Sequence, residues 1–134
     1  MLRPETRARA RALQLLYAWE AQNRPPLAEV IGGLAGKDRR RWQPGVALAE
    51  RVTGEVGRLD AEIAQSAEHW RLERIGAVER NILRLGTWEL LGEATPPAVA
   101  IDEAVRLARW FAGPKAPGFV NGVLDALARR LGRL

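Results

Sequence analysis

Apolar residues recur along most of the chain at intervals of three and four residues, the spacing of one face of an α-helix. Runs that alternate strictly between apolar and polar residues are nearly absent, so the pattern predicts no sheet. Between the breaks rich in Pro and Gly, the segments consist mostly of Ala, Leu, Arg and Glu, which favour helix. We therefore expect an all-α fold, a compact helical domain of about six helices spanning residues 1–134 as a single domain.

The breaks divide the chain into six expected helices. They span residues 4–23, 26–34, 45–70 and 78–91, followed by one that begins after Pro97 and one that follows Pro117. Within the third, Gly54 and Gly57 are expected to bend the helix or to let another helix approach closely. The fourth is apolar over a wide arc, so it should lie at the centre of the fold.

The first expected helix has a basic polar face. At about 100° per residue, Arg7, Arg11 and Gln14 fall within about 60° of one another, opposite the apolar arc. Arg9 instead points toward the apolar arc. Either the first two turns extend beyond the core or Arg9 is buried against a carboxylate, and we favour the extension. An ordinary solvated helix face is the alternative interpretation of the three polar residues.

The charge of the whole chain supports a binding role for this face. The formal net charge is +5, and the basic residues are 19 Arg and only two Lys, Lys37 and Lys115. Guanidinium groups bind phosphate through paired hydrogen bonds and stack on bases, so this composition suits a polyanionic partner. The densest basic run, Arg39-Arg40-Arg41 beside Trp42, is typical of either an RNA-binding patch or a solvated loop, and we favour the loop.

Several kinds of chemistry are excluded by what the sequence lacks. It has no Cys and one His, His69, which rules out disulfides, thiolate zinc sites and histidine-rich metal sites. No nucleophile elbow or glycine-rich phosphate loop is present. Asp102 and Glu103 diverge by about 100° on a helix, so they do not converge on one ion without help from elsewhere. We expect no metal, no cofactor and no enzymatic activity.

The chain also lacks an apolar run long enough to cross a bilayer. The apolar stretch over residues 13–19 is short, contains Gln14 and is followed by Glu20 rather than a small-residue cleavage site. We interpret it as part of a structural helix and expect a cytoplasmic protein with no membrane partner.

Four segments, in order and spread over nearly the whole chain, resemble signatures of the NusB family. They are Arg7-Ala8-Arg9 with Gln14 and Leu16-Tyr17-Ala18-Trp19, Glu79-Arg80-Asn81-Ile82-Leu83-Arg84-Leu85 with Trp88-Glu89-Leu90, Val99-Ala100-Ile101-Asp102-Glu103-Ala104-Val105, and Phe119-Val120-Asn121-Gly122-Val123-Leu124-Asp125. The last is the most specific. The chain departs from the family pattern in two places. Residues 4–6 are not arginines, so the N-terminal arginine run is less dense, and Lys115 is the only charged residue in the loop before Phe119.

The resemblance implies a fold of two small helical bundles and a function as an RNA-binding transcription antitermination factor. Such a factor binds boxA-type single-stranded RNA of ribosomal transcripts together with NusE, a small-subunit ribosomal protein, and joins an antitermination complex on RNA polymerase. The candidate RNA-binding residues are Arg7, Arg9, Arg11, Gln14, Tyr17, Lys115, Phe119 and Asn121. The candidates for the NusE contact are Glu79 and Arg80.

Structural interpretations of several of these residues stay open. Tyr17 and Phe119 lie at the edges of their helices' apolar faces, where an aromatic ring either stacks on a base or seals the core. Asn121 with Gly122 fits a close helix approach and a buried polar contact, or a direct RNA contact by Asn121. Glu79 is equally typical of a solvated helix face. The tryptophans Trp70, Trp88 and Trp110 are most simply core residues.

Two other functions remain as alternatives, namely the RNA-binding module of an enzyme that modifies ribosomal RNA and a homodimeric protein-interaction module. For the favoured function, we expect the basic first helix to lie beside the start of the last helix, so that both contact one RNA strand.

Overall fold

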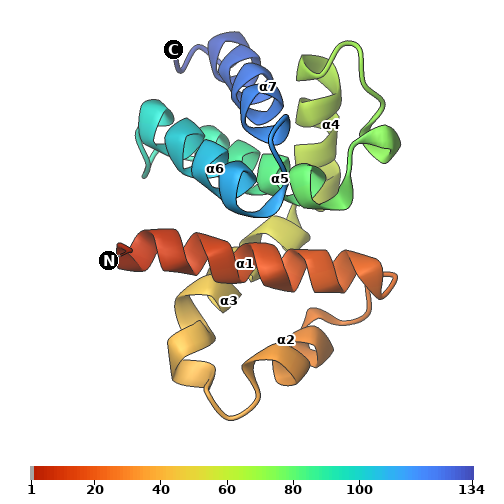
Figure 1. The fold of residues 1–134 in the computed structure, drawn as a ribbon, viewed down its shortest axis with the longest axis vertical. Coiled ribbons are helices and arrows are strands. Elements are labelled where there is room, and N and C mark those ends of the chain that lie inside the picture. The colour runs from red at the N-terminus through yellow and green to blue at the C-terminus, as the bar shows by residue number, and fades with distance from the viewer. Residues whose placement is uncertain (1) are drawn as a thin grey trace. The chain divides into compact units, whose positions relative to one another are not determined.

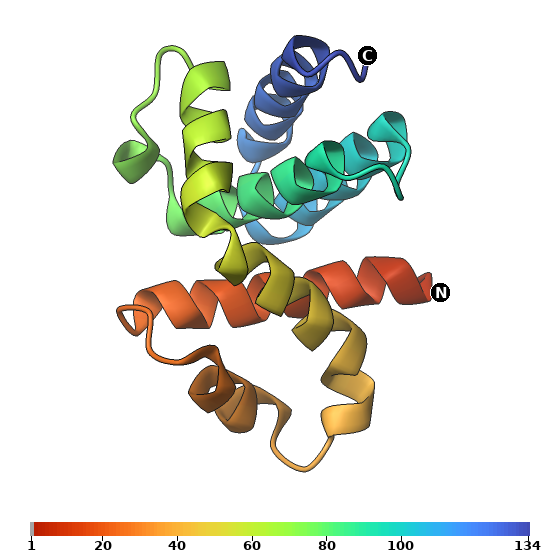
Figure 2. The same cartoon turned by 180° about the vertical axis from the view of Figure 1, so that it is seen from behind.

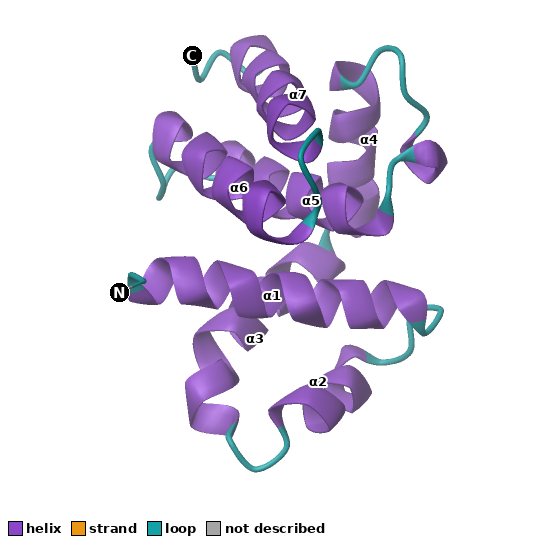
Figure 3. Cartoon of the chain, in the orientation of Figure 1, coloured by secondary structure: helices purple, strands orange, loops and turns teal. Residues whose placement is uncertain are grey.

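The computed structural model describes residues 2–134, which form helices joined by short loops (Figure 3). Within that range there are seven α-helices, one 3-10 turn and no strand, so the prediction of an all-α fold is confirmed. The helices group into two compact units, one ending at Gly54 and one beginning at Glu55. These units correspond to the two small bundles that the resemblance implied (Figure 1).

The N-terminal unit consists of three helices, which are visible from behind in Figure 2. They are α1 (Pro4–Ala21), α2 (Leu27–Ala35) and α3 (Arg39–Gly54). Helix α1 packs against both of the others, and most extensively against α3. The closest approach lies at Gly45, where a Cβ atom would stand 2.8 Å from the Cβ of Arg11. Glycine is therefore needed at this crossing, and it brings the start of α3 close to α1.

The third helix differs from its predicted boundaries. A break was expected at Pro44-Gly45, but both residues lie inside α3, which already begins at Arg39. A proline inside a helix has no N–H for the carbonyl four residues earlier, here that of Arg40. The tight packing of Gly45 against α1 supports the segment in spite of that loss. The run Arg39-Arg40-Arg41 is consequently the first turn of a helix, and its prediction as a loop was wrong.

The predicted helix over residues 45–70 is also divided at Glu55, where α3 ends and α4 (Val56–Ser66) begins. Neither flanking glycine serves a close helix approach, because a Cβ at Gly54 or Gly57 would meet nothing within 4 Å. Gly54 is the last residue of α3, and Gly57 lies in the first turn of α4.

The C-terminal unit is arranged around one central helix. Its elements are α4, a 3-10 turn η1 (Leu72–Arg74), α5 (Ala77–Leu91), α6 (Pro97–Phe111) and α7 (Ala116–Arg130). Helix α5 contacts α4, α6 and α7, and all residues from Asn81 to Thr87 are buried. This confirms the prediction that the segment from residue 78 to 91 is central. At Gly86 a Cβ would lie 2.6 Å from Leu124, so α5 and α7 also approach closely.

A charged cluster lies within this helical unit. The guanidinium of Arg84, only 1% exposed, donates from Nε and Nη2 to the two carboxylate oxygens of Asp60 at 2.7 and 2.9 Å. Its Nη1 donates to Oδ1 of Asn81 at 2.9 Å, and the Asn81 amide donates to the Ala77 carbonyl at 2.8 Å. Such a paired arrangement satisfies groups whose burial alone would be costly, and it ties α4 to α5.

The three tryptophans that were predicted to be core residues differ in their burial. Trp88 is partly buried and donates from Nε1 to Glu55 at 3.2 Å, in line with a structural role. Trp70 and Trp110, in contrast, are 55% and 43% exposed, so the prediction that they are core residues was wrong. Trp110 makes edge contact with Phe111 on α6.

No helix within residues 2–134 combines the length and the apolar character that crossing a membrane requires.

Candidate nucleic-acid interface

The two units carry very different net charge. Residues 1–54 contain ten Lys and Arg against five Asp and Glu, whereas residues 55–134 contain eleven of each kind. The whole formal charge of +5 therefore belongs to the N-terminal unit. A polyanion is attracted to the surface that carries this excess, which favours the N-terminal unit as a nucleic-acid interface.

The polar face of α1 forms as its periodicity predicted. Arg7, Gln14 and Tyr17 are exposed and Arg11 is half-buried, at intervals that place them along one side of the helix. Tyr17 is 46% exposed, so its ring is available to a stacking base rather than sealed into the core. The side carries positive charge, hydrogen-bonding groups and an aromatic ring, the combination that single-stranded nucleic acid requires.

Arg9 does not share this face. It is buried, with 9% of its surface exposed, and it has an interaction partner. The expectation that the first two turns extend beyond the core was therefore wrong, and the alternative of a buried arginine holds. Its burial leaves Arg9 less accessible to a nucleic acid than Arg7 or Gln14.

Arg7 and Arg11 lie in a hollow between α1 and the start of α3. The hollow has a volume of about 520 Å³, and its charged lining residues are Arg7, Arg11, Arg40, Arg41 and Asp38. Nη1 of Arg11 donates to the main-chain carbonyl of Arg41 at 3.0 Å. The run at residues 39–41 was expected to be a solvated loop, but two of its three arginines share a hollow with the α1 face.

Only tertiary structure brings these arginines together, because more than 25 residues separate the two segments along the chain. The available sequence signal was the Arg39-Arg40-Arg41 run itself. It was assigned to a loop because Pro44-Gly45 resembled a helix boundary.

In the C-terminal unit, an aromatic pair formed by exposed Trp70 and half-buried Phe119 marks a second candidate surface. The rings of Trp70 and Phe119 meet edge to face, with centroids 5.7 Å apart and planes at 73°. Trp70 precedes η1 and Phe119 lies in the first turn of α7, so each comes from a different segment. Phe119 was identified from the sequence as a candidate RNA-binding residue, whereas Trp70, which is followed by a polar stretch, was predicted to be a core residue.

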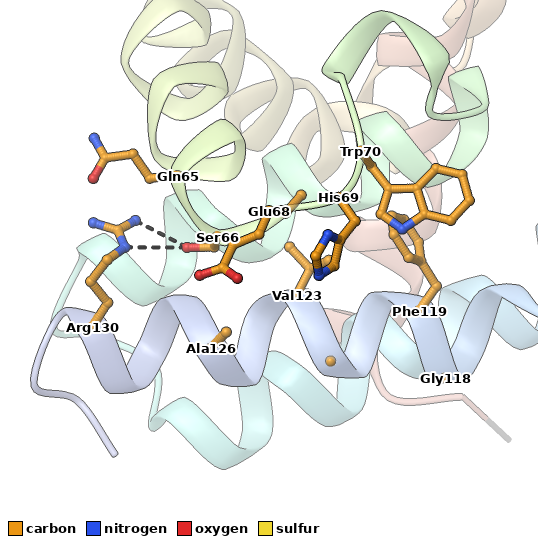
Figure 4. A pocket seen from close by; sticks show the side chains of 12 residues that line it. Gln65, Ser66, Glu68, His69, Trp70, Gly118, Phe119, Val123, Ala126 and Arg130 are labelled. Carbon is orange, nitrogen blue, oxygen red and sulfur yellow. Dashed lines mark hydrogen bonds between the residues drawn. The ribbon is translucent and has the colours of Figure 1, made fainter.

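A hollow lies on each side of this pair. One, of about 270 Å³, is lined by the aromatic pair together with Arg74, Glu79 and Lys115. The other, of about 530 Å³, is the one drawn in Figure 4, where His69 and Trp70 lie over α7 and Arg130 bonds to Ser66. Phe119 and Lys115, both expected to bind RNA, thus share one hollow with Glu79, which was expected to contact NusE.

Asn121 and Gly122 do not take the structural role considered for them. Asn121 is exposed, and a Cβ on Gly122 would meet nothing within 4 Å. A close helix approach with a buried polar contact at this point was therefore a wrong expectation. The exposed amide of Asn121 leaves the other interpretation, a direct contact with a ligand, in place.

Glu79 and Arg80 differ in their availability. The Glu79 carboxylate folds back over Gly76, where a Cβ would stand 2.5 Å from Oε2. Arg80 donates from Nη1 to the main-chain carbonyls of Ile75 at 2.5 Å and Leu72 at 3.4 Å, so it fastens η1 to the start of α5. Of the two, Glu79 faces the hollow, and Arg80 supports the segment that forms its wall.

A model of the NusB family matches residues 6–129, which is nearly the whole chain. The chain belongs to the NusB family. The transcription antitermination protein NusB of Solibacter usitatus is 43% identical over 130 residues, covering 93% of this chain and 88% of that relative. The structure of T. maritima NusB matches with a TM-score of 0.84 at 30% identity, covering 96% of this chain and 93% of that one.

A further NusB-family match is a crystal structure of the antitermination factors NusB and NusE in complex with double-stranded RNA. It has a TM-score of 0.78 and 31% identity, and it covers 97% of this chain and 99% of the matched chain. In the NusB-family chain described here, residues 2–134 contain no group of three or more His, Cys, Asp or Glu placed to hold a metal ion.

Proposed function

We propose that this chain is an RNA-binding transcription antitermination factor. It binds boxA-type single-stranded RNA of ribosomal transcripts together with NusE and joins an antitermination complex on RNA polymerase in the cytoplasm. It acts by binding and not as an enzyme. The observation that carries the proposal is the concentration of the whole net charge in the N-terminal unit of a NusB-family chain, a unit in which the basic face of α1 also presents Tyr17.

The two candidate surfaces contribute differently to RNA binding. On α1, Arg7, Arg11 and Gln14 hold phosphates and Tyr17 stacks on a base. Arg9, being buried, supports this face more than it contacts RNA. On the C-terminal unit, Lys115 supplies charge, Phe119 stacks and Asn121 offers an amide to a base edge.

The NusE contact in this proposal is centred on Glu79, which lines the hollow beside Trp70 and Phe119. Arg80 acts through the wall of that hollow, because its hydrogen bonds hold η1 in place. A partner seated there would lie directly beside Phe119, so we expect NusE and RNA to bind cooperatively.

The test is a titration of the full chain with a boxA-like single strand and a scrambled strand, each with and without NusE. We expect tighter binding to the boxA-like strand and a further gain with NusE. Arg7→Ala should weaken binding and lower the slope of log K against log salt concentration by about 0.7, the value for one phosphate contact on a single strand.

The matched control is Arg109→Ala on α6, which removes the same charge from an exposed position outside both candidate surfaces. It should leave affinity and salt slope nearly unchanged. Affinity that is equal for both strands and insensitive to NusE would contradict the proposal. A homodimer that RNA does not dissociate, seen by sedimentation velocity, would favour the interaction-module alternative.

A further inference from the structure

The hollow between α1 and the start of α3 is lined by clustered arginines, an arrangement that does not itself stabilise the fold. Its charged residues are four arginines and a single acid, Asp38. The first turn of α3 holds three arginines and no acidic residue. Cations at a helix N-terminus oppose the helix dipole, and neighbouring cations repel one another. This arrangement destabilises the free protein locally, and a bound anion would remove the cost.

Contacts within the protein fix the shape of this hollow before any ligand binds. Arg11 is fixed by its bond to the Arg41 carbonyl at 3.0 Å, and its guanidinium lies 5.8 Å from the centre of the Trp42 ring. Close helix packing at Gly45 sets the distance between α1 and α3. These contacts use the main-chain carbonyl of Arg41 and the ring of Trp42, so they do not occupy the guanidiniums of Arg40 and Arg41, of which Arg41 faces Asp38 through Nε.

The acid in the hollow is held loosely. Asp38 lies 3.5 Å from Nε of Arg41, and the two side chains are 56% and 67% exposed. An ion pair this exposed is weak and easily exchanged. Among residues 2–134, neither Arg7 nor Arg40 forms an ion pair. A phosphate entering the hollow would thus face several donors and only one competing carboxylate.

We propose that this hollow is a phosphate-binding subsite in which Arg40 and Arg41, together with Arg7 and Arg11, hold the backbone of single-stranded RNA. The inference rests on the proposed function and extends it to the start of α3. Guanidiniums that contact phosphates fix a strand's position without reading its bases. The subsite therefore raises affinity for any single strand and leaves the preference for the boxA-like sequence to other residues.

The experiment compares wild type with the double variant Arg40→Ala/Arg41→Ala in salt-dependent RNA titrations. Neither substitution removes the carbonyl that fixes Arg11, so the fold of α1 against α3 should persist. We expect affinity at low salt to fall by about tenfold for the boxA-like and scrambled strands alike. The salt slope should decrease by about 1.4, from about 0.7 for each lost phosphate contact on a single strand.

Two matched variants make the result specific. Arg39→Ala removes the same charge from the same turn, but Arg39 does not line the hollow, so we expect less than a twofold loss. Asp38→Asn removes the competing carboxylate and keeps a side chain suited to the start of a helix, so we expect RNA to bind two- to threefold more tightly. Equal losses for Arg39→Ala and for each of the single variants Arg40→Ala and Arg41→Ala would overturn the subsite.

A second measurement distinguishes binding of inorganic phosphate from binding of the RNA backbone. It also distinguishes failure of the subsite from failure of the proposed function. Inorganic phosphate is titrated into the full chain while the Nε–Hε signals of its arginines are followed by NMR, and single-stranded RNA is then added. We expect the signals of Arg11 and Arg41 to shift with phosphate, and RNA to displace the ion. Phosphate that RNA does not displace, or no shift at all, would overturn the inference. If the double variant behaves like wild type while Arg7→Ala still weakens binding, this inference alone fails and the proposed function stands.

Discussion

In the C-terminal unit the arginines mostly face acids or main-chain carbonyls, whereas in the N-terminal unit four of them line one hollow. Arg84 is paired with Asp60, and Arg130 with Glu62 at 2.7 Å. Arg133 donates to the carbonyls of Leu90 and Gly92, which fastens the end of the chain to the α5–α6 loop. The N-terminal hollow holds only Asp38 against its four arginines.

The difference follows from where the carboxylates stand. Both units have about the same number of basic residues, ten and eleven, but the N-terminal unit has fewer than half as many acids. An arginine opposite a carboxylate stabilises the fold, while an arginine without one keeps its donors for a ligand. The number of arginines in a unit therefore says little about its function until the positions of their partners are known.

The largest expected effect is the loss of the buried pair in the C-terminal unit. Arg84→Ala leaves the Asp60 carboxylate partly buried and without its partner, which should cost about 3 kcal/mol or more in the free energy of unfolding. Urea denaturation followed by circular dichroism measures this loss. The control is Arg129→Ala on α7, where hydrogen bonding and attraction from exposed Asp125 raise the pKa of Arg129. That variant should show no measurable change in the unfolding midpoint.

The second prediction concerns the crossing that forms the N-terminal hollow. Gly45→Ala places a methyl group 2.8 Å from Cβ of Arg11 and should destabilise the protein by about 1–3 kcal/mol. RNA affinity should fall with it, because α1 and the start of α3 must separate. Gly33→Ala in α2 is the control, since its Cβ would meet nothing within 4 Å and alanine favours helix. A destabilisation by Gly33→Ala as large as that by Gly45→Ala would contradict this account of the crossing.

The third prediction separates the two surfaces by their dependence on salt. Phe119→Ala should remove one stacked base, a loss of about 1–3 kcal/mol in binding free energy, and leave the salt slope unchanged. Arg7→Ala should cause a smaller loss of binding free energy than Phe119→Ala, but it should lower the salt slope. Fluorescence-anisotropy titrations at several salt concentrations distinguish the two behaviours. Trp110→Ala, an exposed aromatic outside both surfaces, serves as the control. A reduced slope for Phe119→Ala would show that its role is not stacking.

Much of the fold could be predicted from local pattern. The ends of α1, α2 and α5 were predicted to within a few residues, because apolar spacing and flanking Pro or Gly are local signals. The start of α3 was missed because its helix passes through Pro44. Next to Pro44, Gly45 packs closely against Arg11 of α1, a contact between distant segments that local pattern does not report.

Local sequence pattern was enough to predict the helical class, the central place of α5 and the polar side of α1, since each depends on residues three or four positions apart. Tertiary structure alone decided that Arg40 and Arg41 join Arg7 and Arg11, that Trp70 meets Phe119 and that Arg9 is buried. These outcomes depend on contacts between segments distant along the chain. Helical periodicity gives the direction of a side chain on its own helix, but which neighbour it meets is set by how the helices pack.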